Sequence, residues 1–218
     1  LEFRRVLFRS AGAHSSIGMR GLLLFGNAEQ RKKYYPKLAT GEMIAAFCLT
    51  EPGAGSDAAS IKTKAVKDGD GWLITGEKLW ITNGGIADFF TVFARTEGTK
   101  GQITAFIVTR DMKGVSSGPH EDKLGIRASS TTTVHFDNVR VGPEHVIGEV
   151  GRGFKVAMAI LNSGRTGLGG GCVGAMKKVI QLSTKQAKER KQFGKAIAEY
   201  GLIKQKIGHM VVECYASE

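Results

Sequence analysis

Two short stretches combine residue types that suit the binding of a flat, polar ring system. The first, Phe47–Asp57, reads Phe-Cys-Leu-Thr-Glu-Pro-Gly-Ala-Gly-Ser-Asp. It predicts an apolar strand, Ile44–Leu49, that ends in an exposed turn, because proline fixes its own φ while Gly53 and Gly55 permit backbone shapes that other residues avoid. Such a turn presents N–H groups and small hydroxyls to a ligand. The alternative is an ordinary Gly/Pro turn that binds nothing.

The second stretch, Lys78–Gly85, reads Lys-Leu-Trp-Ile-Thr-Asn-Gly-Gly and predicts the end of a strand. Because side chains alternate along a strand, Trp80 and Thr82 are expected on the same face. An aromatic plate beside a hydroxyl donor suits a flat ring with polar edges. The alternative is that Trp80 is a core aromatic of the strand.

Composition narrows the classes of protein that these stretches can belong to. The chain has 218 residues, enough for one or two domains, and a formal net charge of +11. The basic residues are scattered, so a nucleic-acid tail is not predicted and an anionic small molecule suffices as partner. No apolar run approaches the roughly 20 residues of a membrane span. The three cysteines form no CxxC pair, which argues against a zinc site or disulfide framework and favours a reducing compartment.

Three zones of different periodicity must position the two stretches. Ala13–Gly41 predicts helix, turn, helix, with Asn27 starting the second helix, Ala28–Leu38, and Gly41 ending it. Met43–Val150 is β-rich and predicts an antiparallel sheet or small barrel. Its predicted strands are Trp72–Thr75, Lys78–Thr82, Phe89–Arg95, Ile103–Thr109 and Thr131–Val141, with a hairpin turn at Gly76–Glu77.

The last zone, Gly151–Glu218, returns to helical periodicity. Phe154–Leu161 and Ala175–Arg190 are expected to be helical, followed by a break at Phe193-Gly194 and another helix, Ile203–Ser217.

Two further patterns are formal matches to known motifs without the required context. Gly169–Gly174 fits GxGxxG, but a dinucleotide fingerprint follows a strand and this segment follows a predicted helix. We expect close helix packing there instead. Gly114–Gly118 fits the GxSxG nucleophile elbow, but it lacks a strand-to-helix context and is expected to be a loop. The five histidines have no metal-ligand spacing, so no metal site is predicted.

Taken together, Phe47–Asp57 and Lys78–Gly85 resemble the flavin-binding signatures of the acyl-CoA dehydrogenase family. The resemblance runs from about His14 to the end of the chain. It is strongest to the very-long-chain branch, through Gly21–Gly26, Asp57–Ile61, Leu124–Ser130 and Gly151–Arg165.

The fold that the resemblance implies is α+β, in three parts. Residues 1–42 would hold the end of an N-terminal helical domain, after a stretch, Leu1–Ser10, that matches nothing in the family and that we set aside as a cloning or assembly scar or a transit-peptide remnant. Residues 43–150 would be a middle antiparallel β-barrel domain. Residues 151–218 would begin a C-terminal helical bundle, truncated at Glu218.

The resemblance also implies a reaction. Members use FAD to convert a fatty acyl-CoA to trans-2-enoyl-CoA in fatty acid β-oxidation and pass the electrons to electron-transfer flavoprotein. A glutamate takes the α proton, and the β hydrogen leaves as hydride to flavin N5. Positions that match the family's cofactor contacts are Phe47, Leu49, Thr50, Gly55, Ser56, Trp80, Ile81, Thr82, Arg190, Gln192 and Phe193, the last three reaching FAD across a subunit interface. Positions that match its substrate contacts are Ser56, Asn162 and Arg165.

The catalytic glutamate is the main departure from the family pattern. One branch carries it immediately before the helix arginine, where this chain has Gly164. The other members place it later, which corresponds to a position beyond Glu218. In addition, Tyr200-Gly201 stands where many members have a glutamine that helps to hold FAD, as in the very-long-chain branch.

Partners and competing functions follow from the same resemblance. We expect a homo-oligomer, a dimer or a dimer of dimers, in the mitochondrial matrix or at the inner-membrane face, or in a bacterial cytoplasm. One alternative is a non-catalytic relative that serves as an assembly or scaffold protein of a respiratory complex. Another is a basic nucleic-acid-binding protein on the same fold, for which clustered Lys and Arg and steep salt dependence would be required.

The position of the base gives a first testable prediction. We expect the 218-residue chain by itself to show no acyl-CoA dehydrogenase activity, because the resemblance places the base and most of the acyl pocket outside it. The measurement is anaerobic incubation with FAD and palmitoyl-CoA. Turnover above the protein-free rate would contradict the expectation.

Overall fold

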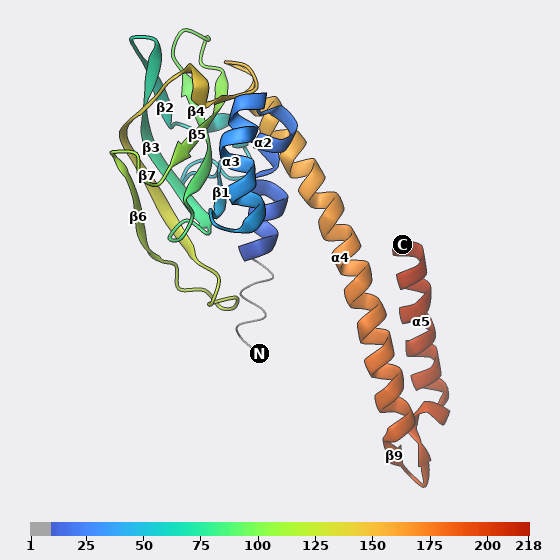
Figure 1. The fold of residues 1–218 in the computed structure, drawn as a ribbon. Helices are drawn as coiled ribbons and strands as arrows, with labels where there is room; N and C mark the ends of the chain where they lie inside the picture. The colour runs from blue at the N-terminus through green and yellow to red at the C-terminus, as the bar shows by residue number, and fades with distance from the viewer. Residues whose placement is uncertain (1–9) are drawn as a thin grey trace. The chain divides into compact units, whose positions relative to one another are not determined.

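The chain divides into two compact units along its length. The computed structural model describes residues 10–218, so all but Ser10 of the stretch Leu1–Ser10 lies outside the described residues. The first unit ends at Ser163 and the second runs from Gly164 to Glu218. One long helix, α4 (Gly153–Glu189), begins in the first unit and ends in the second (Figure 1).

The first unit opens with helical segments. A π-helical turn, η1 (His14–Gly18), is followed by α2 (Arg20–Phe25) and α3 (Ala28–Thr40). The predicted N-cap is confirmed, because the Asn27 side chain accepts a bond of 2.8 Å from the Gln30 amide and the Gln30 side chain accepts one of 3.0 Å from the Asn27 amide. The predicted stop is also confirmed, since Gly41 has the left-handed φ of 79°.

The remainder of the first unit is dominated by an eight-stranded sheet in the order β6-β7-β3-β2-β4-β5-β8, with β1 paired to β4. Most pairs are antiparallel, but β1–β4 and β2–β4 are parallel. The α+β class is therefore confirmed, while the sheet is mixed rather than purely antiparallel. Its strands are β1 (Ala45–Cys48), β2 (Lys64–Asp68), β3 (Gly71–Thr82), β4 (Phe89–Thr96), β5 (Ile103–Thr109), β6 (Val115–His120), β7 (Thr131–Val141) and β8 (Val146–Ile147).

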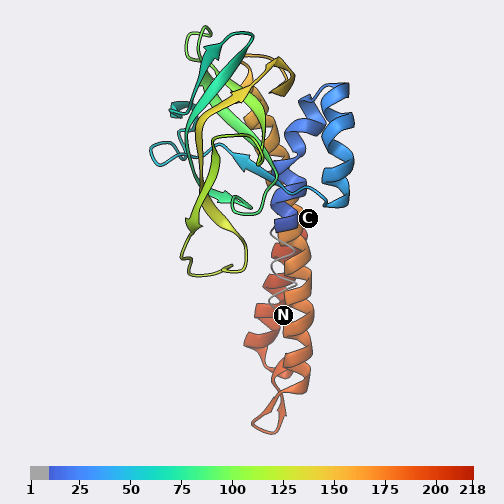
Figure 2. The same ribbon diagram turned by 60° about the vertical axis from the view of Figure 1, so that its left-hand side comes forward.

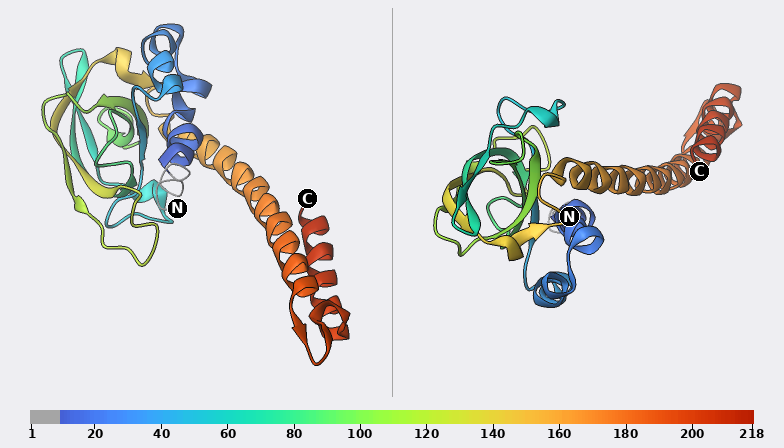
Figure 3. Two further views of the ribbon diagram at one scale, coloured as in Figure 1. Left: turned by 60° about the horizontal axis from the view of Figure 1, so that its bottom comes forward. Right: turned by 90° about the horizontal axis from the view of Figure 1, so that it is seen from above.

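Both faces of this sheet are covered where its central strands lie. Along β4, Phe89 and Phe93 face a core shared with η1, α2 and α3, whereas Phe90 and Val92 face a second core formed by the strands themselves. Figure 2 shows η1, α2 and α3, drawn in blue, on one side of the sheet, and the view from above in Figure 3 shows the sheet curving around on itself. Strands buried on both faces read as nearly continuous apolar runs.

The hairpin expected at Gly76–Glu77 is absent, and that prediction was wrong. β3 runs unbroken through these residues, and the turn lies earlier, at Gly69, where φ is 58°. The pairing of β3 with β7 shifts register between Ile74 and Gly76, which marks a bulge. A Cβ on Gly76 would lie 2.5 Å from the Thr63 hydroxyl, so glycine is needed here for close approach rather than for a turn.

The GxSxG segment also differs from expectation. Residues Val115–His120 form the edge strand β6, in which Ser117 pairs with Val134 of β7. The Ser117 hydroxyl donates to the Gly84 carbonyl at 2.8 Å and accepts from Arg110 at 2.8 Å. The segment is thus a strand, and its Ser117 hydroxyl binds the neighbouring loop that contains Gly84.

The second unit is a helical hairpin. The predicted helices Phe154–Leu161 and Ala175–Arg190 belong to the single helix α4, which contains Gly169–Gly174. The predicted break at Phe193-Gly194 is confirmed as the tip of a small hairpin. The hairpin consists of β9 (Lys191–Gln192) and β10 (Lys195–Ala196) and is followed by η4 (Ile197–Glu199) and α5 (Gly201–Ser217).

Within this unit α4 and α5 lie side by side (Figures 1 and 3), and Lys177 pairs with Glu218 at 2.6 Å. No atom lies within 4 Å of where a Cβ would be on Gly169, Gly170, Gly171 or Gly174, so the close packing expected there is not seen in residues 10–218. None of the helices in this described range is long and apolar enough to cross a bilayer.

The close approach at Gly76 gives a prediction on stability. Gly76→Ala is expected to lower the free energy of unfolding by about 1–3 kcal/mol, because the added methyl overpacks against Thr63. Gly69→Ala is the matched control: it also introduces a strained φ, but no other atom among residues 10–218 lies within 4 Å of the new Cβ, so we expect a loss of only about 1 kcal/mol. Urea unfolding measures both, and equal losses would contradict the close-packing explanation.

Candidate functional site

The turn after β1 is closed by its own backbone. Glu51 and Ala54 exchange two hydrogen bonds of 3.1 Å each. Neither Gly53 nor Gly55 is among the residues with positive φ, so the special backbone freedom expected of them is not used. No atom of the described part of the chain lies within 4 Å of where their Cβ atoms would be, which leaves the outer surface of the turn open to a ligand.

At the end of β3, a second bulge turns the indole of Trp80 outward. The pairing with β7 shifts register between Lys78 and Ile81, and Trp80 has a φ of 56°, a genuine outlier for a bulky residue. The Trp80 side chain is 63% exposed, which excludes the core-aromatic alternative. Trp80 and Thr82 line one pocket of about 380 Å³, so their predicted common face is confirmed.

The pocket takes its other lining from the loop between β6 and β7 and from the start of β7. These residues are Glu121, Asp122, Lys123, Gly125, Ile126, Ser129 and Thr131. Ile126 is a second left-handed residue, with φ of 57°, so two strained positions border the same cavity. Backbone strain of this kind is concentrated at ligand-binding sites.

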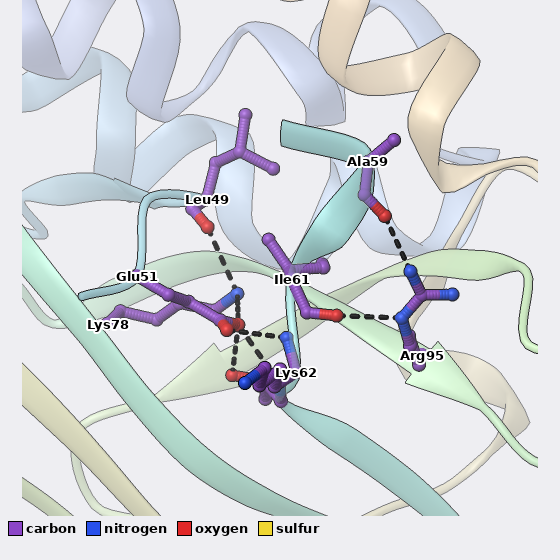
Figure 4. A network of polar contacts seen from close by, with 8 residues as sticks. Leu49, Glu51, Ala59, Ile61, Lys62, Lys78 and Arg95 are labelled. Atoms are coloured by element: carbon purple, nitrogen blue, oxygen red, sulfur yellow. Dashed lines mark hydrogen bonds and ion pairs between the residues drawn. The ribbon is translucent and has the colours of Figure 1, made fainter. Parts of the chain in front are cut away.

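A buried ion pair, shown in Figure 4, lies between the two stretches. Lys78 Nζ is 2.8 Å from Glu51 Oε1, and the two side chains are 0% and 6% exposed. Lys78 also donates to the Leu49 carbonyl at 3.1 Å. Sequence reasoning missed this pair, because Lys78 directly follows Gly76 and Glu77 in the sequence and no local signal marks it as buried.

The carboxylate of Glu51 is satisfied by several donors besides Lys78. It accepts bonds from the Thr63 hydroxyl at 2.6 Å, the Thr63 amide at 3.0 Å and the Lys62 amide at 2.5 Å. Burial acts to raise the pKa of Glu51, but the Lys78 ammonium and these donors hold that pKa below its usual value. Burial lowers the pKa of Lys78 despite the neighbouring Glu51 carboxylate.

Backbone contacts complete the connection. The Leu79 amide donates to the Thr50 carbonyl at 2.9 Å, which joins the turn to the end of β3 directly. Arg95 of β4 donates to the Ile61 carbonyl at 2.7 Å and to the Ala59 carbonyl at 2.6 Å, fixing the segment after the turn (Figure 4). The structure therefore brings the two predicted stretches together as one surface of the first unit.

The predicted cofactor-binding residues of the first unit differ in what they can offer. Thr50 and Thr82 are half-buried, and Gly55 and Ser56 are exposed, so their polar groups can be reached. Leu49 and Ile81 are buried in the two cores and can offer only backbone groups. Phe47 is half-buried with its ring centroid 5.0 Å from that of Phe93.

The remaining predicted residues lie on or after α4. Asn162 and Arg165 are exposed on that helix, one on each side of the boundary between the units. Arg190, Gln192 and Phe193 belong to the second unit, where the Gln192 carbonyl accepts a bond of 2.9 Å from the Tyr200 hydroxyl. Their binding roles stay predictions.

Three family models match the chain. Residues 46–139 match "Acyl-CoA dehydrogenase, middle domain", residues 151–218 match "Acyl-CoA dehydrogenase, C-terminal domain", and residues 2–42 match "Acyl-CoA dehydrogenase, N-terminal domain". The last match begins inside the stretch Leu1–Ser10 that we had set aside from the family.

Similar proteins are found among both curated and solved ones. The human mitochondrial very long-chain specific acyl-CoA dehydrogenase is 53% identical over 95% of this chain, and a probable acyl-CoA dehydrogenase of Bacillus subtilis is 49% identical over 96%. The chain spans 33% and 35% of their lengths, about a third. The crystal structure of an acyl-CoA dehydrogenase complexed with FAD from Bacillus anthracis has a TM-score of 0.89 and 45% identity, covering 96% of this chain and 36% of its own.

The ion pair gives a prediction on pH dependence. The pKa of Glu51 is lower in the folded chain than the roughly 4.3 of an unfolded one, so unfolded chains bind more protons in that window and stability rises with pH. The stability that Glu51 contributes is therefore complete above about pH 4.3 and lost as pH falls through the folded-state pKa. The double variant E51Q/K78M is expected to lack this acid loss, which urea unfolding at a series of pH values measures.

The control for this experiment is Arg140→Gln, which removes two exposed ion pairs, one with Asp68 and one with Asp70. We expect a change within about 1 kcal/mol and an unaltered acid limb. A double variant with the same acid limb as the unsubstituted chain would show that Glu51 does not contribute to it.

Proposed function

Because the chain belongs to the acyl-CoA dehydrogenase family, we propose that it serves the FAD-dependent α,β-dehydrogenation of long- or very-long-chain fatty acyl-CoA in β-oxidation. The product would be trans-2-enoyl-CoA, with the electrons passed to electron-transfer flavoprotein. The preference for long chains is supported by the 53% identity with the human very long-chain specific relative.

The residues of the candidate site fit FAD. The exposed Trp80 indole is a plate for a flat ring, and the Thr82 hydroxyl borders the same pocket. The open surface above Gly53 and Gly55 lets backbone N–H groups approach a pyrophosphate closely. The observation that carries the proposal is this outward-facing indole, held in a strained conformation beside an open turn.

Bound FAD supplies an acceptor for the hydride that leaves the β carbon of the substrate. Around it we assign roles to this chain's own residues. The Thr82 hydroxyl would donate a hydrogen bond to the edge of the bound ring and so stabilise negative charge there. Trp80 stacks beside the ring and excludes water from that side. Ser56 hydrogen-bonds at the border between cofactor and acyl-CoA, and Asn162 and Arg165 of α4 bind the acyl-CoA.

We also propose a homo-oligomer in which Arg190, Gln192 and Phe193 reach the FAD of a partner subunit. Phe193 is 94% exposed at the tip of the β9–β10 hairpin and is therefore accessible to a partner subunit. The compartment we propose is the mitochondrial matrix or a bacterial cytoplasm, by analogy with the mitochondrial and Bacillus relatives.

Substitutions in the pocket test the assignment of FAD. We expect Trp80→Ala to weaken FAD binding by about five- to 150-fold through lost stacking of roughly 1–3 kcal/mol. Thr82→Val should weaken it by about two- to tenfold through one lost hydrogen bond. Quenching of flavin fluorescence on titration measures both. The matched controls are Trp72→Phe and Thr75→Val, on the same strand but outside the pocket, and equal effects in variants and controls would refute the assignment.

The reaction itself is tested by the visible spectrum of a flavin-loaded protein that contains this chain. Anaerobic palmitoyl-CoA is expected to bleach the flavin band, because substrate oxidation reduces the flavin. A yellow protein that stays yellow with acyl-CoA of every chain length would contradict the dehydrogenase proposal and favour the assembly-protein alternative.

A further inference from the structure

The buried ion pair cannot touch a ligand. The side chains of Lys78 and Glu51 are 0% and 6% exposed, beneath the surface that carries the turn and Trp80. Any effect of this pair on a bound ring must therefore act through the backbone. Two isolated charges in the interior are costly, and even a paired set is often no more stable than apolar side chains of the same volume. A contribution to stability is therefore not a sufficient reason for this ion pair to be present.

The pair connects several segments of the chain. Through Lys78 and Glu51, β3 is linked to the Leu49 carbonyl at the end of β1 and to the Lys62 and Thr63 amides that precede β2. These segments contribute the turn on one side and the strand end on the other. Together these hydrogen bonds hold the end of β1, the segment before β2 and strand β3 in fixed positions relative to one another.

The residues immediately after Lys78 in β3 depart from regular strand geometry. Regular alternation from a buried Lys78 would point the Trp80 side chain inward, but the bulge between Lys78 and Ile81 reverses it. Trp80 thereby takes a left-handed φ of 56°, which persists only if its surroundings enforce it. Lys78 is anchored two residues before Trp80, and the Leu79 amide between them is bound to Thr50.

We propose that Lys78 and Glu51 are positioning residues, which hold the turn 50–57 and the strand end 78–83 as one ring-binding surface with the Trp80 indole turned outward. The inference deepens the proposed function and rests on it for the identity of the ligand, FAD. The outward orientation of Trp80 in the unliganded chain does not depend on that identity.

The experiment uses the 218-residue chain in a Trp72→Phe background, where Trp80 is the only remaining tryptophan. Lys78→Met is compared with Ile74→Ala, a fully buried β3 residue that makes no link between the segments. Both variants are expected to lose several kcal/mol of stability. All measurements are made at a temperature at which circular dichroism shows each variant to be folded.

Two readouts separate positioning from stability. In Lys78→Met, acrylamide quenching of Trp80 in the absence of flavin is expected to fall, because the indole relaxes inward. The dissociation constant for FAD is expected to rise by about tenfold as the strained surface is lost. In Ile74→Ala both readouts are expected to stay within about twofold of the background, although the stability loss is similar.

Each outcome decides the inference. Equal readouts for Lys78→Met and Ile74→Ala, or unchanged quenching of Trp80, would overturn it. If the unsubstituted chain does not bind FAD, the assignment of FAD to this surface is contradicted for the chain by itself, and the quenching comparison still decides whether the pair positions Trp80. If Lys78→Met does not fold, the double variant E51Q/K78M replaces it, because that variant leaves no lone buried charge.

Discussion

The architecture of the first unit depends on a lysine and a glutamate that share the protein interior. Each ion removed from water carries a desolvation penalty of several kcal/mol, so either charge is costly there without the other. Glu51 meets this demand with bonds from Lys78, Lys62 and Thr63, and Lys78 adds one to Leu49. The end of β1, the start of β2 and the middle of β3 consequently cannot move independently.

The mixed sheet holds in place the segments that the ion pair connects. β1 and β2 both pair in parallel with β4, so the ends of the segments that meet at the ion pair are held by one central strand. Arg95 of β4 binds the same connection from its other side. One core lies between the sheet and the helices, and another lies among the strands. The sheet that carries Trp80 and the turn is therefore packed on both of its faces.

Much of this could be read from the sequence, and the failures share a physical cause. Runs rich in β-branched and aromatic residues gave β5 and β7 with their observed limits, and local cap chemistry gave Asn27 as the N-cap of α3. The hairpin at Gly76 was wrong because a Gly-Glu pair satisfies local turn rules, whereas the reason for the glycine lies at Thr63. The ion pair joins residues 27 positions apart, which no local pattern records. The prediction that Trp80 and Thr82 share a face was right, although a bulge between Lys78 and Ile81 interrupts the regular alternation of the strand.

The amide hydrogen exchange of Leu79 in the unliganded chain tests the central claim most directly. This amide bonds to Thr50 between the buried pair and the strained Trp80, so it reports whether turn and strand end form one rigid surface. If they do, the Leu79 amide exchanges only when the unit unfolds, at the rate of core amides such as Val92, and the rate rises steeply with denaturant. Exchange that is orders of magnitude faster and insensitive to low denaturant would show local opening, and would contradict the account.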